Sequence, residues 1–323
     1  MTNNALVLAS PRKAYAARID QLSEKSVAKH FDAYEDIAWN DPRFQIHLDD
    51  PRFEKSGDDV LGRTDWYRSQ PAAVRARIGL HHLAAQMKFG IDFEAVLSRG
   101  LLEFTSTLPN GAPEFRYAYH EIVEEAQHSM MFQEFVNRTG LPVKGLGGLV
   151  RFTSRFVPRL GRSFPELFFL YVLAGETPID RVQRTALAEL DLHPLQRRVL
   201  QIHVTEEARH ICFAKAYLRE HVPRLNALRR FTLAVRAPAI LSTMARQMLD
   251  PPAALVRTYG IPKSVVREAY IDNPEHHAQV VAGLEPIRTL CEELGLISGL
   301  PAALWRAFGL QPRATNHTRQ LRE

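Results

Sequence analysis

Cysteine is scarce in this sequence, and other features typical of particular protein classes are missing. The chain has 323 residues and 2 cysteines, Cys212 and Cys291, whose separation fits neither a disulfide scaffold nor a thiolate metal site, so we expect a reducing, cytoplasmic compartment. No stretch approaches the roughly 20 apolar residues that a membrane span requires. The first residues also lack the apolar run of a signal peptide. The sequence therefore predicts a protein without a membrane segment.

Dense blocks of basic charge are also absent, although the net charge is +5 and the pI is about 9.3. The basic residues are spread along the chain, apart from short clusters at 224–230 and 313–322. A nucleic-acid-binding surface would show a denser basic stripe. We therefore expect no nucleic-acid partner and interpret the clusters as solvated helix faces or as a patch for an acidic partner.

Strand signals are nearly absent, because alternation of apolar and polar residues never persists. Glycine and proline instead separate long segments with a helical period. Four long helices are predicted at about 72–108, 113–139, 164–190 and 194–220, with breaks in the first near Gly90 and Gly100. The connection between the second and third is the longest, and this topology is that of ferritin-like bundles.

The predicted fold is therefore all-α, a ferritin-like four-helix bundle in residues 72–220 of a single domain, 1–323. Residues 1–71 are expected to form an N-terminal helix and an irregular segment rich in proline and aspartate. Residues 221–323 are expected to form shorter helices and a frayed tail.

The same word, Glu-Glu-Ala-x-His, occurs twice, in "VEEAQHSM" (123–130) and "TEEARHIC" (205–212). Glu and His three positions apart share a helix face. A single Glu-x-x-His is more often an exposed Glu with a packed His than a pair of ligands. Two copies at matched positions are harder to obtain by chance.

The positions do match when each word is counted from the turn of its own hairpin. The first turn is centred on Asn110, and Glu94 precedes it by nearly the same number of positions as Glu125 and His128 follow it. At about 1.5 Å per helical residue, these side chains are about 22–27 Å from the turn. An antiparallel hairpin therefore brings them to one level.

The second hairpin repeats these offsets around Leu192. Glu176 precedes Leu192 by the same number of positions as Glu94 precedes Asn110. Glu207 and His210 likewise follow Leu192 by the same numbers of positions as Glu125 and His128 follow Asn110. The two hairpins are therefore expected to present matching sets of side chains.

Two other acidic residues of the first hairpin compete with Glu94. Glu103 lies about 13 Å too close to its turn, and Asp92 points about 200° away around the helix. Glu94 therefore remains the expected ligand of this helix.

Four carboxylates and two imidazoles, one Glu and one Glu-x-x-His from each hairpin, form the ligand set of dinuclear iron or manganese sites in helical bundles. Two divalent ions would neutralise four carboxylates that otherwise repel one another in a core. Oxygen and imidazole ligands suit iron, or manganese as the alternative, better than a thiol-rich zinc site.

One position distinguishes the two words. His203 lies four positions before Glu207 and shares its face, so it is a seventh ligand, an outer hydrogen-bond donor or a core histidine. The equivalent residue in the first hairpin is Glu121, which we expect just outside the ligands. Asp180 lies at the level of His203 across the second hairpin and is predicted to orient its imidazole.

With these residues, the chain resembles the p-aminobenzoate N-oxygenase family of non-haem diiron enzymes. The resemblance is carried by Glu94, by Glu125-x-x-His128, by Glu176 and by His203-x-x-x-Glu207-x-x-His210. It implies that four Glu and three His, including His203, bind two iron ions, and that the protein is a homodimer.

The resemblance further implies an oxygenase that uses dioxygen to oxidise the nitrogen of an arylamine or related small amine. An electron donor of the ferredoxin or reductase type is the expected partner. The alternatives are a diiron C–H hydroxylase or desaturase, and a ferritin-like iron-binding protein or ferroxidase.

Overall fold

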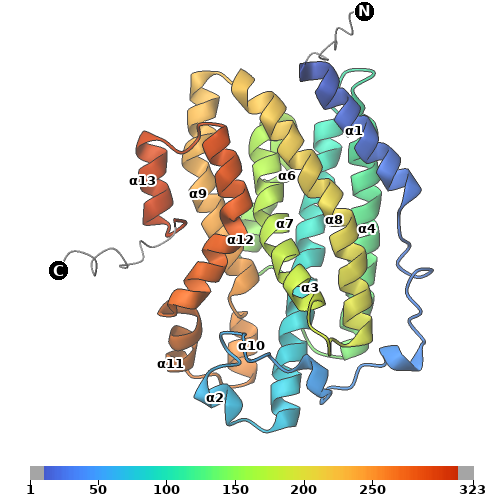
Figure 1. Cartoon of the computed structure of the whole chain (residues 1–323), viewed down its shortest axis with the longest axis vertical. Coiled ribbons are helices and arrows are strands. Elements are labelled where there is room, and N and C mark those ends of the chain that lie inside the picture. The colour runs from blue at the N-terminus through green and yellow to red at the C-terminus, as the bar shows by residue number, and fades with distance from the viewer. Residues whose placement is uncertain (1–10, 312–323) are drawn as a thin grey trace, which may run out of the picture.

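The bundle predicted from the sequence is present. The computed structural model describes residues 11–311, and every regular element in that range is a helix (Figure 1). The four long segments are α3 (Ala72–Thr105), α4 (Pro113–Thr139), α7 (Pro165–Leu187) and α8 (Pro194–His221). α3 packs along α4 and α7 packs along α8, each pair joined by a short turn. These elements confirm the all-α bundle. The predicted frayed tail lies largely outside the described residues.

Proline and glycine set the ends of the bundle helices. Pro113, Pro165 and Pro194 lie in the first turns of α4, α7 and α8, where a missing backbone N–H costs nothing. α4 ends at Gly140, whose φ of 64° is the left-handed conformation that glycine adopts without strain. The hairpin boundaries therefore follow from local sequence.

α3 is one continuous helix, so the predicted breaks at Gly90 and Gly100 are wrong. Both glycines instead allow close packing. A Cβ on Gly100 would lie 2.1 Å from the ring of Phe168, and one on Gly90 would lie 3.1 Å from Phe132. The absent side chains make room for aromatic rings from neighbouring helices.

The long connection between the hairpins contains two short helices, α5 (Gly148–Ser154) and α6 (Pro158–Ser163). α6 packs directly on α3, and a Cβ on Gly161 would lie 2.0 Å from the carbonyl oxygen of Gly100. Asp92 also holds this connection, because its Oδ2 accepts a hydrogen bond from the Leu146 amide at 2.7 Å. Asp92 therefore faces away from the bundle interior, as predicted.

The N-terminal helix α1 (Pro11–Ala28) lies against α4 and α8. The segment that follows is mostly irregular and contains only η1 (Pro42–Phe44), η2 (Pro51–Phe53) and α2 (Asp65–Arg68). Asp41 and Asp50 cap the two 3-10 turns by accepting from the backbone N–H two positions further on. This arrangement agrees with the irregular segment predicted there.

The C-terminal region contains longer helices than predicted. α9 and α12 are 23 and 20 residues long, and both pack on α7 (Figure 1). The elements of this region are η3 (Val222–Arg224), α9 (Ala227–Leu249), α10 (Ala253–Thr258), α11 (Lys263–Val266), η4 (Arg267–Ile271), α12 (Pro274–Glu293) and α13 (Gly299–Ala307). α7 is therefore covered on its outer side, which explains why it is apolar over most of its circumference.

The main hydrophobic cluster joins the bundle to the outer helices. Leu97 of α3, Phe169 of α7 and Phe213 of α8 belong to the same cluster as Leu233 of α9 and Leu284 of α12. Among the helices of residues 11–311, none combines the length and the apolar character needed to cross a bilayer.

Candidate metal centre

The seven side chains predicted as ligands come together in the interior of the bundle. Each is no more than 3% exposed. Together with Glu121, they form overlapping groups in which one nitrogen or oxygen of each residue lies within 4.8 Å of the others: Glu94, His128 and His203; Glu125, His128 and Glu207; Glu176, His203 and Glu207; and Glu121, Glu125 and His210. Glu103 is partly exposed and belongs to none of these groups, as the height argument predicts.

Glu125 and Glu207 occupy the middle of the cluster, between the two imidazoles of the repeated words. His128 Nδ1 lies 3.6 Å from Glu125 Oε2 and 3.4 Å from Glu207 Oε1. His210 Nδ1 lies 3.3 Å from Glu125 Oε1 and 3.2 Å from Glu207 Oε1. Both histidines thus direct Nδ1 at the same two carboxylates, so two cations bound here could share Glu125 and Glu207.

The other nitrogen of each imidazole is held by the first Glu of the opposite word. His128 Nε2 bonds Glu206 Oε2 at 2.8 Å, and His210 Nε2 bonds Glu124 Oε2 at 2.8 Å. A carboxylate acceptor keeps the proton on Nε2 and leaves the Nδ1 lone pair facing the centre. The sequence reasoning missed Glu124 and Glu206, although the doubled Glu in both words was the signal for them.

Arg209 joins these two outer carboxylates. Its Nη2 lies 2.8 Å from Glu124 Oε1 and 3.5 Å from Glu206 Oε1, and its Nε donates to Ser26 Oγ at 3.1 Å. Arg209 is 7% exposed, so its guanidinium supplies positive charge where both carboxylates are buried. It also ties the centre to α1.

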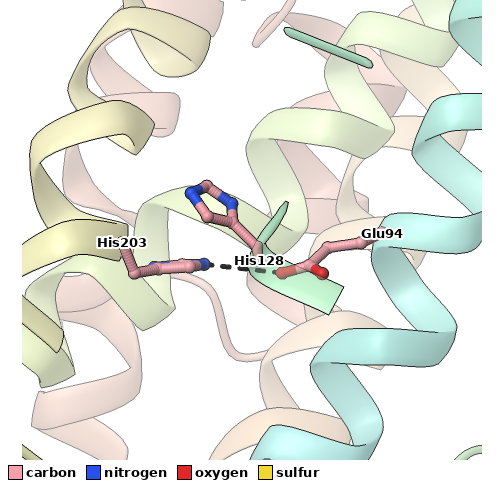
Figure 2. A group of neighbouring side chains, drawn as sticks. All are labelled: Glu94, His128 and His203. Atoms are coloured by element: carbon pink, nitrogen blue, oxygen red, sulfur yellow. Dashed lines mark ion pairs between the residues drawn. The ribbon is translucent and has the colours of Figure 1, made fainter. Parts of the chain in front are cut away.

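His203 faces the cluster from the side of Glu94 (Figure 2). Its Nε2 lies 3.6 Å from Glu94 Oε1 and from Glu207 Oε1. Glu94 is also held by Ser129, whose Oγ donates to Oε2 at 2.8 Å. Figure 2 shows the His128 ring beside this pair. The third histidine is thus placed to contribute a nitrogen to the centre.

The predicted partner of His203 is corrected by the structure. Gln183, not Asp180, bonds His203 Nδ1, at 2.7 Å through Oε1. Asp180 pairs with Arg184, one helical turn further along α7, at 2.8 Å. The prediction matched Asp180 and His203 by height alone and neglected rotation about the axis of α7. Gln183 orients the ring without bringing a further charge.

Burial and the neighbouring charges shift the pKa values of the side chains in the centre. Burial raises the pKa of Glu94, and burial with the neighbouring Glu207 and Glu125 raises that of Glu176. Burial disfavours charge on the imidazoles, but the surrounding carboxylates override it and raise the pKa of His128 and His210 well above the usual range. Without cations, therefore, the cluster would retain protons.

The donor atoms fit two hard or borderline cations. Both oxygens of Glu125, Nδ1 of His128, Oε1 of Glu176 and Oε2 of Glu207 are buried without a hydrogen-bond partner among the described residues. Buried polar atoms normally have a hydrogen-bond partner, so several buried atoms without one around a single point indicate that an ion binds there. Oxygen and imidazole donors without a thiolate suit iron or manganese.

Aromatic rings close the surroundings of the centre. The ring of Phe132 lies 5.0 Å from that of His203. Phe93 covers Gly175, where a Cβ would lie 2.0 Å from the ring, and its ring is 5.5 Å from that of Tyr171. Burial and the charge of Glu176 raise the pKa of Tyr171. The ring of Phe132 thus covers His203, and the ring of Phe93 covers the backbone one residue before Glu176.

Comparison with known proteins agrees with the site. The family model described as "P-aminobenzoate N-oxygenase AurF" matches residues 12–295. "Uncharacterized protein MT0908" of Mycobacterium tuberculosis (strain CDC 1551 / Oshkosh) is 41% identical over 293 residues, which is 90% of this chain and 86% of the relative. "Uncharacterized protein Mb0909" of Mycobacterium bovis (strain ATCC BAA-935 / AF2122/97) is 40% identical with the same coverage. No solved structure gives a significant match.

Proposed function

The chain belongs to the p-aminobenzoate N-oxygenase family, and on that premise we propose that it is a diiron oxygenase that uses dioxygen to oxidise the nitrogen of a small arylamine or related amine. The observation that carries the proposal is the convergence of two half-sites, one from each hairpin, on a point where buried donor atoms lack hydrogen-bond partners within residues 11–311.

The residues would divide between two iron positions. Glu94, His128 and His203 form one group and would hold one ion. His210, on the other side of Glu125 and Glu207, would bind the second ion. Glu176, which groups with His203 and Glu207, would complete the set. Glu125 and Glu207, between the imidazoles, would serve both. Two divalent ions match four carboxylates in charge, which relieves the cost of burying those carboxylates together. When bound, the irons would supply the binding and reduction of dioxygen.

The protein itself supplies orientation and exclusion of water. Glu206 and Glu124 keep a proton on Nε2 of the two imidazoles, and Gln183 fixes the ring of His203. The rings of Phe132 and Phe93 lie against His203 and Gly175, and they would help to keep water from the donor atoms. A dry, fixed ligand set of this kind favours oxidation of a bound substrate over release of reduced oxygen to solvent.

The test is an oxidation assay on the reduced, iron-loaded chain. We expect oxygen-18 from labelled dioxygen in the hydroxylamine, nitroso or nitro product of at least one arylamine in a panel. Glu207→Ala should give no product, and Asp180→Ala should retain activity. Oxidation confined to C–H substrates would favour the hydroxylase or desaturase alternative. Iron oxidation without any organic product would favour a ferroxidase.

We also propose that a protein electron donor docks at a hollow between α1 and α8. The hollow has a volume of about 370 Å³, and its lining includes Lys25, Lys29 and Arg209. Arg209 leads inward to Glu124 and Glu206, which hold the imidazoles. Basic side chains suit an acidic redox protein. Charge reversal at Lys25 and Lys29 should slow turnover with a protein donor but not with dithionite.

We also propose a homodimer, which the outer face of α4 supports. Phe115, Tyr119, Val123 and Met130 follow one stripe of that helix and are 39–60% exposed. Apolar residues in one exposed row are typical of protein contacts. Light scattering should give the mass of two chains, and Val123→Lys should reduce it to one. A monomeric wild type would contradict the dimer.

A further inference from the structure

Glu121 is a buried carboxylate with no role in the account above. It is 1% exposed, and neither of its oxygens has a hydrogen-bond partner among the residues that the structure describes. One oxygen lies within 4.8 Å of ligand atoms of both Glu125 and His210. A carboxylate buried without a donor is costly, so this side chain either retains a proton or binds a cation.

The two hairpins place Glu121 and His203 in equivalent positions. Each lies four positions before the inner Glu of its word, Glu125 or Glu207. His203 belongs to two groups, one with Glu94 and His128 and one with Glu176 and Glu207. Glu121 instead groups with Glu125 and His210, the imidazole farther along the same helix as His203. The residue that mirrors the third histidine is thus a carboxylate at the opposite cation position.

The nearby groups do not satisfy Glu121. Tyr117, one helical turn upstream, is also buried, and its hydroxyl has no hydrogen-bond partner among the described residues, so it does not donate to Glu121. The guanidinium of Arg209 donates its hydrogen bonds to Glu124, Glu206 and Ser26. An ion beside His210 would meet the free oxygens directly.

We propose that Glu121 is an eighth side chain of the metal centre and a ligand of the ion beside His210. This inference rests on the proposed diiron function and adds a fifth carboxylate to it. One ion then has two imidazoles, whereas the other has one imidazole and an additional hard, anionic oxygen. The two irons are therefore inequivalent, and the position at Glu121 favours iron(III).

The test compares wild type, Glu121→Gln and the control Glu103→Gln, in which a partly exposed carboxylate is changed. Each chain is titrated anaerobically with Fe(II) against a chelator, and each iron-57 form is examined by Mössbauer spectroscopy. We expect Glu121→Gln to weaken one of the two ions by about tenfold or more and to shift one quadrupole doublet. Glu103→Gln should leave both ions and both doublets unchanged.

Thermal melting separates a ligand role from a structural one. Because the carboxylate is unpaired without metal, metal-free Glu121→Gln should melt at or above the temperature of the metal-free wild type. A lower melting temperature, or unchanged affinity and doublets, would overturn the proposal for Glu121 alone. A wild-type chain that takes up no pair of irons would overturn the proposed function with it.

Discussion

The two adjacent Glu residues of each repeated word make different contacts. Glu125 and Glu207 face the imidazole Nδ1 atoms, whereas Glu124 and Glu206 hold Nε2 of the imidazole on the opposite helix. The pattern is reciprocal, so each helix orients the histidine of the other. A single word could not provide this arrangement.

Removing the charge of Glu206 should weaken metal binding without removing a ligand. Glu206→Gln keeps a side chain that can accept from His128 Nε2 but loses the negative charge that makes the ring more basic. Loss of such outer partners costs about 10–100-fold in metal affinity. An anaerobic Fe(II) titration measures it, with Glu103→Gln as the control. Equal affinity in Glu206→Gln and wild type would contradict this role.

His203 offers a second residue-scale test, because the predicted and observed partners differ. Gln183→Leu removes the acceptor at His203 Nδ1 and should lower iron affinity about tenfold. Asp180→Ala should leave affinity unchanged, since Asp180 pairs with Arg184. The same titration applied to both variants decides between them. The reverse result would restore the original prediction.

At the level of elements, the hairpins were predictable and their contacts were not. Pro113, Pro194 and the apolar period predict α4 and α8 closely, because capping and periodicity are local. The interpretation of Gly90 and Gly100 as breaks failed, since a glycine needed for close packing looks the same in sequence as one that ends a helix. α5 and α6 were missed for a similar reason: such short helices depend on packing against α3.

The contact between α6 and α3 should be intolerant of a methyl group. In Gly161→Ala the new Cβ would meet the backbone of Gly100, which no rotamer change can relieve. Overpacking of this kind costs about 1–3 kcal/mol. Urea unfolding of the variant measures it. Gly57→Ala, where the new Cβ meets nothing within 4 Å, is the control and should lie close to wild type.

For the whole molecule, the metal-free centre makes stability depend on pH. The pKa of Glu121 is raised to about 8 by burial, and those of Glu94 and Glu176 are raised above 4.5. Acids with raised pKa stabilise the fold fully below their unfolded pKa, near 4.5, and this stabilisation is lost as pH rises through the folded pKa. His128 and His210 act in the same direction, from an unfolded value of 6.5.

The metal-free chain should therefore become less stable between about pH 5 and pH 9. Glu124 and Glu207, whose pKa values are lowered, give stability that is lost only in acid, as pH falls below about 4.5. Bound cations replace the retained protons, so the difference in melting temperature between metal-loaded and metal-free chain should widen with pH. A metal-free chain that is most stable near pH 8 would contradict this assignment.

Six of the inner side chains were predicted from motif spacing, because a helix fixes height and face from residue number alone. The resemblance to the family added the ligand role of His203. The outer layer could not be predicted in this way. The partners of His203, the role of Arg209 and the covering of α7 by α9 and α12 depend on rotation and on contacts between segments far apart in the chain. These features depend on tertiary packing, which no local pattern encodes.

The central claim is that the two hairpins together hold a pair of irons. Anomalous diffraction at the iron edge, from crystals of the iron-loaded chain, tests it most directly. The account predicts two peaks inside the bundle, each beside the carboxylates of Glu125 and Glu207, and loss of both in Glu207→Ala. Iron found only at the surface, or no ordered iron in a well-folded chain, would contradict it.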